Sequence, residues 1–283
     1  MPTSTQKTSK SVNVGLRSFR YQKQHHTDLA HPSYQIGNQF TMTTSNPSTE
    51  GLCYVTSAVR NPHHLSDAKF NDFYDNEHVP DILRYGFSKL ALRYKNADPE
   101  SKAAYLALYP LDDVAKVSSP TTAEMMEECR RSRILDGQDH HELIDYDVSA
   151  WSKIQTFEGH GHSDKTGRER GQTLVAVFVE PGDGAEAEAE VDTWYRKQHL
   201  DVLSMCRGYR RSTRYRLAGE GGEGGPRLLA LHEYACAPEE LPTEQIQQSR
   251  ETEWAREVLG NLKGFEREVW RLVGVQGVEG MKL

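Results

Sequence analysis

The chain has 283 residues, of which 36% are hydrophobic, and its formal net charge is −7. No apolar run approaches the roughly 18–20 residues that a membrane-spanning helix needs, and the short basic stretches are interrupted by acids. The sequence therefore predicts a globular protein with neither a membrane nor a nucleic acid as its partner.

The first segment, residues 1–48, is rich in Ser, Thr, Gln and Asn, and we expect a disordered N-terminal tail there. Its basic residues, accompanied by one acid before Glu50, leave an organellar transit peptide open as an alternative. Four cysteines, far apart and without a CxxC pair, predict free thiols in a reducing compartment. We therefore expect a cytoplasmic protein.

From residue 49 onward, the alternation of apolar residues predicts a first unit over 49–157. Its expected elements, in chain order, are a strand over 52–59, an amphipathic helix over 67–85, strands over 88–95 and 103–110, a helix over 121–133 and a strand over 142–156.

A polar linker over 158–170 precedes a second unit, residues 171–275, and a C-terminal tail over 276–283 follows it. The second unit is expected to contain a strand over 172–180, a helix over 188–206, strands over 210–217 and 226–235, a helix over 243–261 and a strand over 264–273.

The two units match each other at a constant offset of 121 residues. The matching pairs are Tyr74 with Tyr195, His78 with His199, and Arg93-Tyr94 with Arg214-Tyr215. Each unit reads βαββαβ, the ferredoxin-like order. One such sheet leaves a face open, so two copies can bury both faces by closing a barrel. We predict an α+β fold of two tandem ferredoxin-like repeats, forming an intramolecular dimeric α+β barrel.

The first helix of each unit carries a tyrosine and a histidine four residues apart, on the apolar ridge that faces the core. In the first unit Pro80 follows His78 and has no N–H for the carbonyl of Asn76. The helix should loosen there, and the freed carbonyl should need water or a polar partner. We therefore expect a pocket beside His78.

The segment "FNDFYDNEHVP" (70–80), placed after a strand in a βαββαβ unit, resembles the dimeric α+β barrel superfamily, and most closely its EthD-like members, in which a "WY…EHxP" helix is typical. The first copy has Phe73 where tryptophan is usual. The second keeps Trp194, Tyr195 and His199 but lacks the proline. The resemblance covers nearly all of residues 51–275, and it implies the fold more strongly than the reaction.

The resemblance implies chemistry without metal or organic cofactor, on an aromatic or polyketide-like small molecule of secondary metabolism. A histidine in an apolar pocket stays neutral at pH 7 and can take a proton from a phenol or an activated carbon. We predict His78 as the acid/base and Tyr74 as its assistant, in a cyclase or decarboxylase reaction. A cofactor-free oxygenase is the nearest alternative.

Two alternatives to a cofactor-independent enzyme stay open. One is a small-ligand-binding or structural barrel without catalysis, and the other is a heme enzyme with His78, His199 or His232 as the axial ligand. Pairing of whole chains into a homodimer also stays open. The secondary candidates for the site are His199, Tyr195, His232, Arg93 and Tyr94.

Other conspicuous residues are expected to be structural. Arg93 and Arg214 lie at mid-strand and are expected to form ion pairs across the sheet or at the interface between the two units, although they could hold a substrate carboxylate or carbonyl. Trp151 and Trp270 match each other in the fourth strands and should pack in the core. The histidine doublets His25-His26, His63-His64 and His140-His141, with the nearby His160 and His162, lack metal-ligand spacing and are expected to be solvated.

Overall fold

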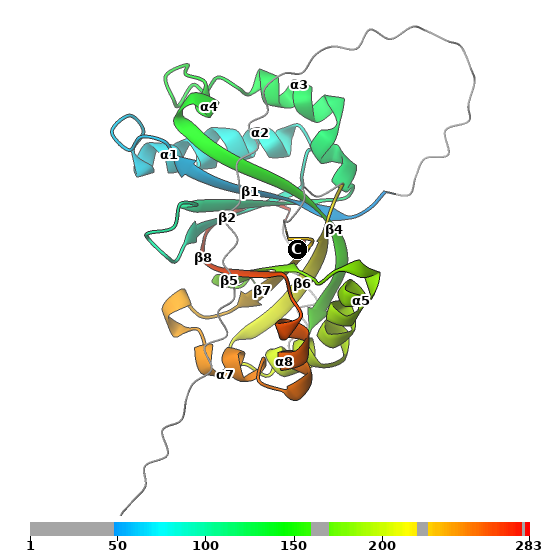
Figure 1. Ribbon diagram of the computed structural model, residues 1–283. Coiled ribbons are helices and arrows are strands. Elements are labelled where there is room, and N and C mark those ends of the chain that lie inside the picture. The colour runs from blue at the N-terminus through cyan, green and yellow to red at the C-terminus, as the bar shows by residue number, and fades with distance from the viewer. Residues whose placement is uncertain (1–47, 160–169, 220–225, 279–280) are drawn as a thin grey trace, which may run out of the picture.

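The computed structural model describes residues 48–159, 170–219, 226–278 and 281–283. Eight antiparallel strands close a barrel, and helices pack on its outside at two opposite ends (Figure 1). The predicted tail over 1–48 and most of the linker over 158–170 lie outside the described residues.

The first half supplies β1 to β4 and the helices that cover them. Its elements are β1 (Gly51–Val59), α1 (Asp67–Phe73), the π-helix η1 (Tyr74–His78), α2 (Val79–Arg84), β2 (Leu90–Asn96), β3 (Tyr105–Leu111), the 3-10 helix η2 (Val114–Ser118), α3 (Pro120–Glu128), α4 (His140–Leu143) and β4 (Ile144–Glu158).

The second half follows the same order of strands and main helices. Its elements are β5 (Thr173–Glu180), α5 (Gly184–Trp194), the π-helix η3 (Tyr195–His199), α6 (Leu200–Ser204), β6 (Tyr209–Leu217), β7 (Leu228–Tyr234), the 3-10 helix η4 (Pro238–Glu240), α7 (Thr243–Gln248), α8 (Glu253–Gly260) and β8 (Gly264–Gly277).

The long strands β4 and β8 close the barrel by pairing in both halves. The strand order is β1-β3-β2-β8-β5-β7-β6-β4, and β4 returns to β1. The early part of β8 pairs with β5, whereas its later part pairs with β2. In the same way β4 pairs first with β1 and then with β6. No strand of the barrel is therefore left with an unpaired edge.

Alternation along each strand divides the side chains between the barrel interior and two outer cores. In β1, Leu52 and Tyr54 face the interior cluster, whereas Cys53 and Val55 join the cluster under the helices of the first half. This follows from the two-residue period of a strand. Trp151 and Trp270 lie in the interior cluster, as expected, so the interior is a packed core.

Two predicted helices end earlier than the sequence pattern suggested. The helix expected over 121–133 stops at Glu128, because the carboxylate of Glu77 accepts the backbone N–H groups of Arg133 and Ile134 and holds that segment away. The helix expected over 243–261 is divided in two. Thr252 begins α8 as an N-cap that accepts from the Ala255 N–H, which fixes a new helix start.

The C-terminal segment does not behave as a simple tail. β8 continues to Gly277, and the side chain of Leu283 is buried in the interior cluster of the barrel. Its backbone carbonyl accepts from the Thr213 hydroxyl at 3.3 Å. Figure 1 shows this end of the chain between the two halves of the sheet.

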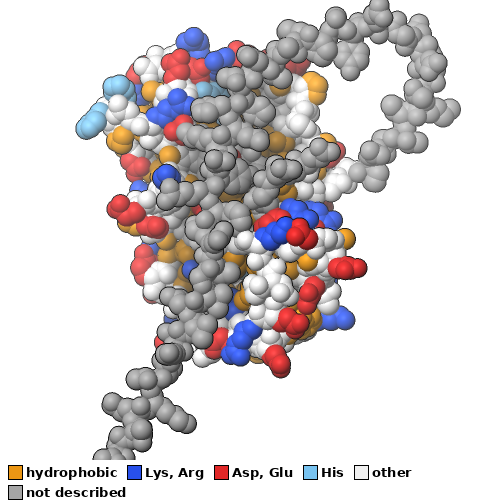
Figure 2. Space-filling model, viewed as in Figure 1, with side chains coloured by type: hydrophobic (Ala, Val, Ile, Leu, Met, Phe, Trp, Pro, Cys, Tyr) orange, Lys and Arg blue, Asp and Glu red, His pale blue; other side chains and the backbone are white. Residues whose placement is uncertain are grey.

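The visible surface carries acidic and basic side chains interspersed with each other (Figure 2). Among the helices of the described residues, none combines the length and apolarity required to cross a bilayer.

Candidate functional site

The tyrosine and histidine that match between the two halves lie in a π-helical turn in each half, Tyr74–His78 and Tyr195–His199. The N–H of Val79 bonds to the carbonyl of Tyr74, and the N–H of Leu200 bonds to that of Tyr195, five residues back in both cases. Such turns occur mostly as single insertions within α-helices, frequently at functional sites. Each turn brings its two rings together edge to face, at 5.1 Å in the first half and 5.0 Å in the second.

The proline is not the cause of the turn, because η3 forms without one. In a π-helix each N–H bonds to the carbonyl five residues back. Pro80 has no N–H, so the carbonyl left without this bond is that of Asp75 and not that of Asn76. The side-chain amide of Gln276, on β8, donates to the Asp75 carbonyl at 2.9 Å. The polar partner expected next to the proline is thus the Gln276 amide of β8, and it serves the carbonyl of Asp75 instead of that of Asn76.

A strand arginine lies over each tyrosine and is paired with a helix aspartate. The Arg93 guanidinium is 4.5 Å from the Tyr74 ring centre and forms an ion pair with Asp75. Arg214 is 4.3 Å from the Tyr195 ring and 2.8 Å from an Asp192 oxygen. These arginines hold the helix against the sheet, so their ion pairs run from strand to helix and not across the sheet.

Tyr94, a secondary candidate, does not join either site. It is buried in the interior cluster of the barrel, on the face of β2 opposite to that of its neighbour Arg93. The two-residue period of the strand sends adjacent side chains to opposite faces, which the pairing of Arg93 with Tyr94 in one motif had concealed.

In the first half, aromatic rings surround His78. The ring centres of Tyr74, Phe73 and His140 lie 5.1, 5.4 and 5.6 Å from that of His78. The prediction of a solvated His140 is wrong, because its side chain is fully buried and its Nδ1 lies 2.9 Å from the Tyr146 hydroxyl. Tertiary packing brings this histidine from the start of α4 to the motif helix. His63 and His64 are exposed, as expected.

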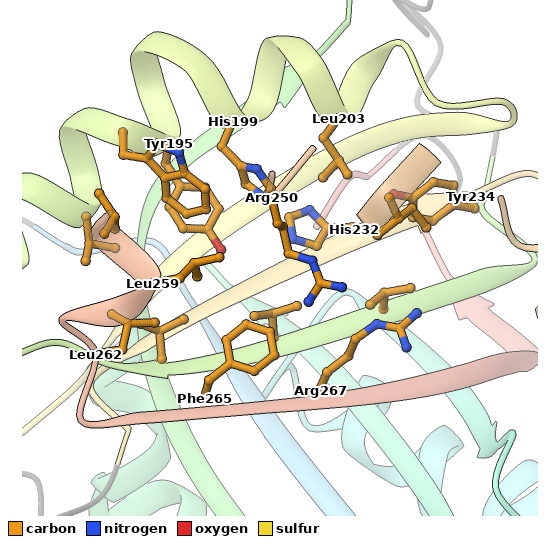
Figure 3. A pocket seen from close by; sticks show the side chains of 17 residues that line it. Tyr195, His199, Leu203, His232, Tyr234, Arg250, Leu259, Leu262, Phe265 and Arg267 are labelled. Carbon is orange, nitrogen blue, oxygen red and sulfur yellow. The ribbon is translucent and has the colours of Figure 1, made fainter. Parts of the chain in front are cut away.

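In the second half, a cavity of about 40 Å³ lies under the π turn, between the helices and the sheet. Figure 3 shows Tyr195, His199 and His232 on its walls, together with Arg250 and Arg267. Most of the remaining lining is aliphatic or aromatic, including Val175, Val177, Val179, Leu203 and Phe265. The cavity therefore combines an apolar wall with a few convergent polar groups, the usual composition of a small-molecule site.

His232 reaches this cavity because its strand position faces the helices and not the barrel interior. Its Nδ1 lies 2.6 Å from the Ser212 hydroxyl oxygen, which accepts from the Tyr209 hydroxyl at 2.9 Å. This contact holds the His232 ring in place at the cavity wall.

His199 has a different environment. Its ring stacks on Trp194 at 4.2 Å, and its Nδ1 is buried without a partner among the described residues. The backbone carbonyl of Ser249 bonds to the ring and favours its protonated form. Because Nδ1 is unpartnered, that bond belongs to the Nε2 proton. The Nδ1 lone pair is then available to accept a proton.

Burial lowers the pKa of His78, His199 and His232 to about 3 in each case. The nearby guanidinium of Arg250 lowers the pKa of His199 further, and that of Arg267 does so for His232. These imidazoles are neutral at pH 7. Burial raises the pKa of Tyr195 to about 12, so its hydroxyl keeps its proton.

Sequence reasoning missed Arg250 and Arg267. Arg250 lies in the turn between α7 and α8, inside a segment expected to be one continuous helix, and Arg267 lies mid-strand among acids. The alternation of β8 did contain a signal, since Trp270 faces the interior and Arg267 is three residues away, on the other face. No group of three or more acidic, histidine or cysteine side chains in the described part of the chain is arranged to hold a metal.

Comparison with known proteins places the fold. No family model matches the chain. Core atranone cluster (CAC) protein 1 of Stachybotrys chlorohalonatus is 29% identical over 226 residues, covering 71% of this chain and 87% of that protein.

Two solved structures resemble the barrel at low sequence identity. An anthrone oxidase-like protein superposes with a TM-score of 0.52 at 11% identity, over 86% of this chain and 98% of that one. A mutant chlorite dismutase from Candidatus Nitrospira defluvii superposes with a TM-score of 0.53 at 9% identity, over 81% and 93%. The chain therefore shares the fold of these two structures, a closed antiparallel barrel covered by helices.

Proposed function

We propose that the chain is an enzyme of secondary metabolism that removes a proton from an aromatic or polyketide-like small molecule, in the cavity of its second half. The observation that carries this proposal is the meeting of Tyr195, His199 and His232 at one largely apolar cavity under the π turn. The similarity to a protein named for the atranone cluster supports a biosynthetic role.

In the proposed reaction His199 Nδ1 accepts the proton of a phenol or an activated carbon, and the Tyr195 hydroxyl and the His232 ring hold the substrate oxygen. The pKa of about 3 for His199 makes protonation costly at pH 7. The cost falls when negative charge develops on the substrate beside the ring, and the nearby guanidinium groups stabilise that charge. Cyclisation or decarboxylation would follow from the resulting carbanion or enolate.

A cofactor-free oxygenase would start with the same proton removal, so the proposed base does not distinguish the two. A heme, in contrast, does not fit beside His199 and His232 as the side chains stand. Sites for drug-sized groups span roughly 300–1,000 Å³, whereas the cavity beside His199 and His232 measures about 40 Å³. We therefore derive no step through heme.

The Tyr74–His78 pair remains the second candidate site. It has the same turn, the same arginine over the tyrosine and the same neutral imidazole. Its ring nitrogens stand among Phe73, Tyr74 and His140, and the cavity described above belongs to the other half.

The test is an incubation of the purified chain with a panel of hydroxylated aromatic ketones, anthrones and acids, in air and under argon. Products are identified by mass spectrometry, with carbon dioxide release and oxygen uptake recorded in parallel. Turnover under argon supports cyclase or decarboxylase chemistry, and turnover that requires oxygen supports the oxygenase. Turnover that survives both His199→Gln and Tyr195→Phe removes the second-half cavity from the proposal.

The finer family assignment is also a proposal. We infer that the two halves are tandem ferredoxin-like repeats of the EthD-like kind. Each half contributes strands in the spatial order fourth, first, third, second, and each places Tyr-x-x-x-His in a π turn. Limited sequence duplication with a constant offset of 121 residues supports the same conclusion.

A further inference from the structure

Two guanidinium groups stand at the second-half cavity without a negative partner. Arg250 comes from the turn between α7 and α8 and Arg267 from β8, and Figure 3 shows both guanidinium groups at the cavity. Over the described ranges neither arginine forms an ion pair with an acid, and Arg250 Nε is buried without a hydrogen-bond partner. By contrast, Arg214 nearby is neutralised by Asp192.

The charged groups that act on the titratable side chains of the cavity are arginines. Burial and the like charge of Arg250 both lower the pKa of Arg267, and only the Tyr234 hydroxyl opposes them. The charges that act on His199 are those of Arg250 and Arg214, and those that act on His232 are Arg214 and Arg267. No carboxylate of the described chain contributes to either histidine.

An unneutralised pair of this kind is unfavourable unless something anionic joins it. A buried donor that loses water without gaining an acceptor costs about 1–3 kcal/mol, and more for a charged group. Arg267 is exposed and lies on the solvent side of the cavity. Arg250 is half-buried and lies closer to Tyr195 and His199. An anion placed between them would lie at the mouth of the cavity, next to the proposed reacting groups.

The geometry points to a carboxylate-recognition site: Arg250 and Arg267 bind the carboxylate of an aromatic acid, whose ring enters the apolar cavity beside Tyr195 and His199. This inference rests on the proposed function and narrows its substrate to carboxylic acids. A planar guanidinium matches a carboxylate with two parallel hydrogen bonds, which a neutral amide cannot reproduce. The volume of about 40 Å³ holds a small group as it stands, so a ring enters when apolar lining side chains such as Leu259 and Leu262 move aside, while Arg250 stays on the carboxylate.

The experiment is a calorimetric titration of the full chain with benzoate and with benzamide, which has nearly the same shape without the charge. We expect benzoate to bind at least about tenfold more tightly, because a hydrogen bond between two charged groups is stronger than one to a neutral amide. Arg250→Gln should weaken benzoate binding to about the level of benzamide and so remove this preference, and Arg250→Lys, which keeps the charge, should retain part of it.

Arg256→Gln is the matched control, because Arg256 lies on α8, is exposed and does not line the cavity. It should bind benzoate as the unmodified chain does. Equal affinities for the two probes, a preference that survives Arg250→Gln together with Arg267→Gln, or no binding of either probe would each overturn the inference.

Binding and turnover separate this inference from the proposed function. If benzoate is preferred but His199→Gln leaves turnover intact, the carboxylate site stands and the catalytic assignment fails. If the benzoate preference is absent but His199→Gln and Tyr195→Phe both abolish turnover, the enzyme assignment stands and the substrate is not a carboxylic acid.

Discussion

The two halves place the same tyrosine and histidine in the same π turn, yet they surround them differently. In the first half Phe73, His140 and Tyr146 pack around the pair, and the Asp75 carbonyl is bonded by Gln276. In the second half the corresponding space is a cavity edged by Arg250 and Arg267. The same π turn thus lies against packed aromatic rings in one half and beside a cavity in the other. The difference comes from the side chains that surround the turn.

The strand positions around the pair show how this difference arises. Cys53 in β1 pairs with Tyr109, whereas Val175 in β5 pairs with His232. The Tyr109 hydroxyl is buried without a hydrogen-bond partner in the described structure, and the phenol stands where the second half has the smaller imidazole of His232. That imidazole lines the cavity and is anchored by Ser212.

The largest expected difference between the halves is in turnover. His199→Gln should lower kcat by at least about a hundredfold, the typical contribution of a positioned acid or base. His78→Gln, the matched change in the first half, should lower it by less than about threefold. Single-turnover rates on the substrate found by the panel check this, with circular dichroism to confirm folding. The reverse ranking would move the active site to Tyr74 and His78.

The second largest difference is expected when a larger side chain is placed in the matching space of each half. Val177 lines the cavity and pairs with Ala230, and Val55 in the first half pairs with Ala107 in the same way. Val55→Phe should overpack its core and reduce the free energy of unfolding by about 1–3 kcal/mol. Val177→Phe should cost less, because the ring enters the cavity, and should block ligand binding. Urea unfolding of both variants measures the difference, and equal losses would argue that the cavity is not usable space.

The pH dependence of stability should be similar in the two halves. The folded pKa values of His78 and His199 are about 3, below the unfolded value of about 6.5. Above pH 6.5 both states are neutral, so the shift changes nothing. Below it the unfolded chain binds protons that the folded chain does not. Each histidine therefore removes up to about 2 kcal/mol of stability by pH 5, and the loss ends near pH 3.

His78→Gln and His199→Gln should each flatten this dependence by one proton, as read from urea unfolding between pH 7.5 and 5. If a variant leaves the pH dependence of the free energy of unfolding unchanged, its histidine is already charged in the folded protein. The two halves would then differ in the protonation of their histidines.

The smallest expected effect tests the partner of the Asp75 carbonyl. Gln276→Ala should lower the free energy of unfolding by about 1 kcal/mol, the net value of one hydrogen bond. Pro80→Ala supplies an N–H within reach of that carbonyl in the π register, so Gln276→Ala should cost little in its background. Additive losses in this double-mutant cycle would show that Gln276 and Pro80 are not coupled through Asp75.

The sequence by itself determined the elements and the inward direction of the key rings. Hydrophobic alternation gave the eight strands, because a two-residue period is a local property of the chain. The i, i+4 spacing put Tyr74 with His78 and Tyr195 with His199 on the buried side of their helices, and the expected burial of Trp151 and Trp270 is confirmed.

Only the tertiary structure decided which pair meets a cavity and what else reaches it. Several residues reach the two pairs from segments that are distant in sequence: His140, Gln276, Arg250 and Arg267. Their local sequence patterns do not indicate that they lie near the motif helices in space. The register of the closed barrel and the break between α7 and α8 bring them there, because packing selects positions in space, whereas periodicity selects only faces.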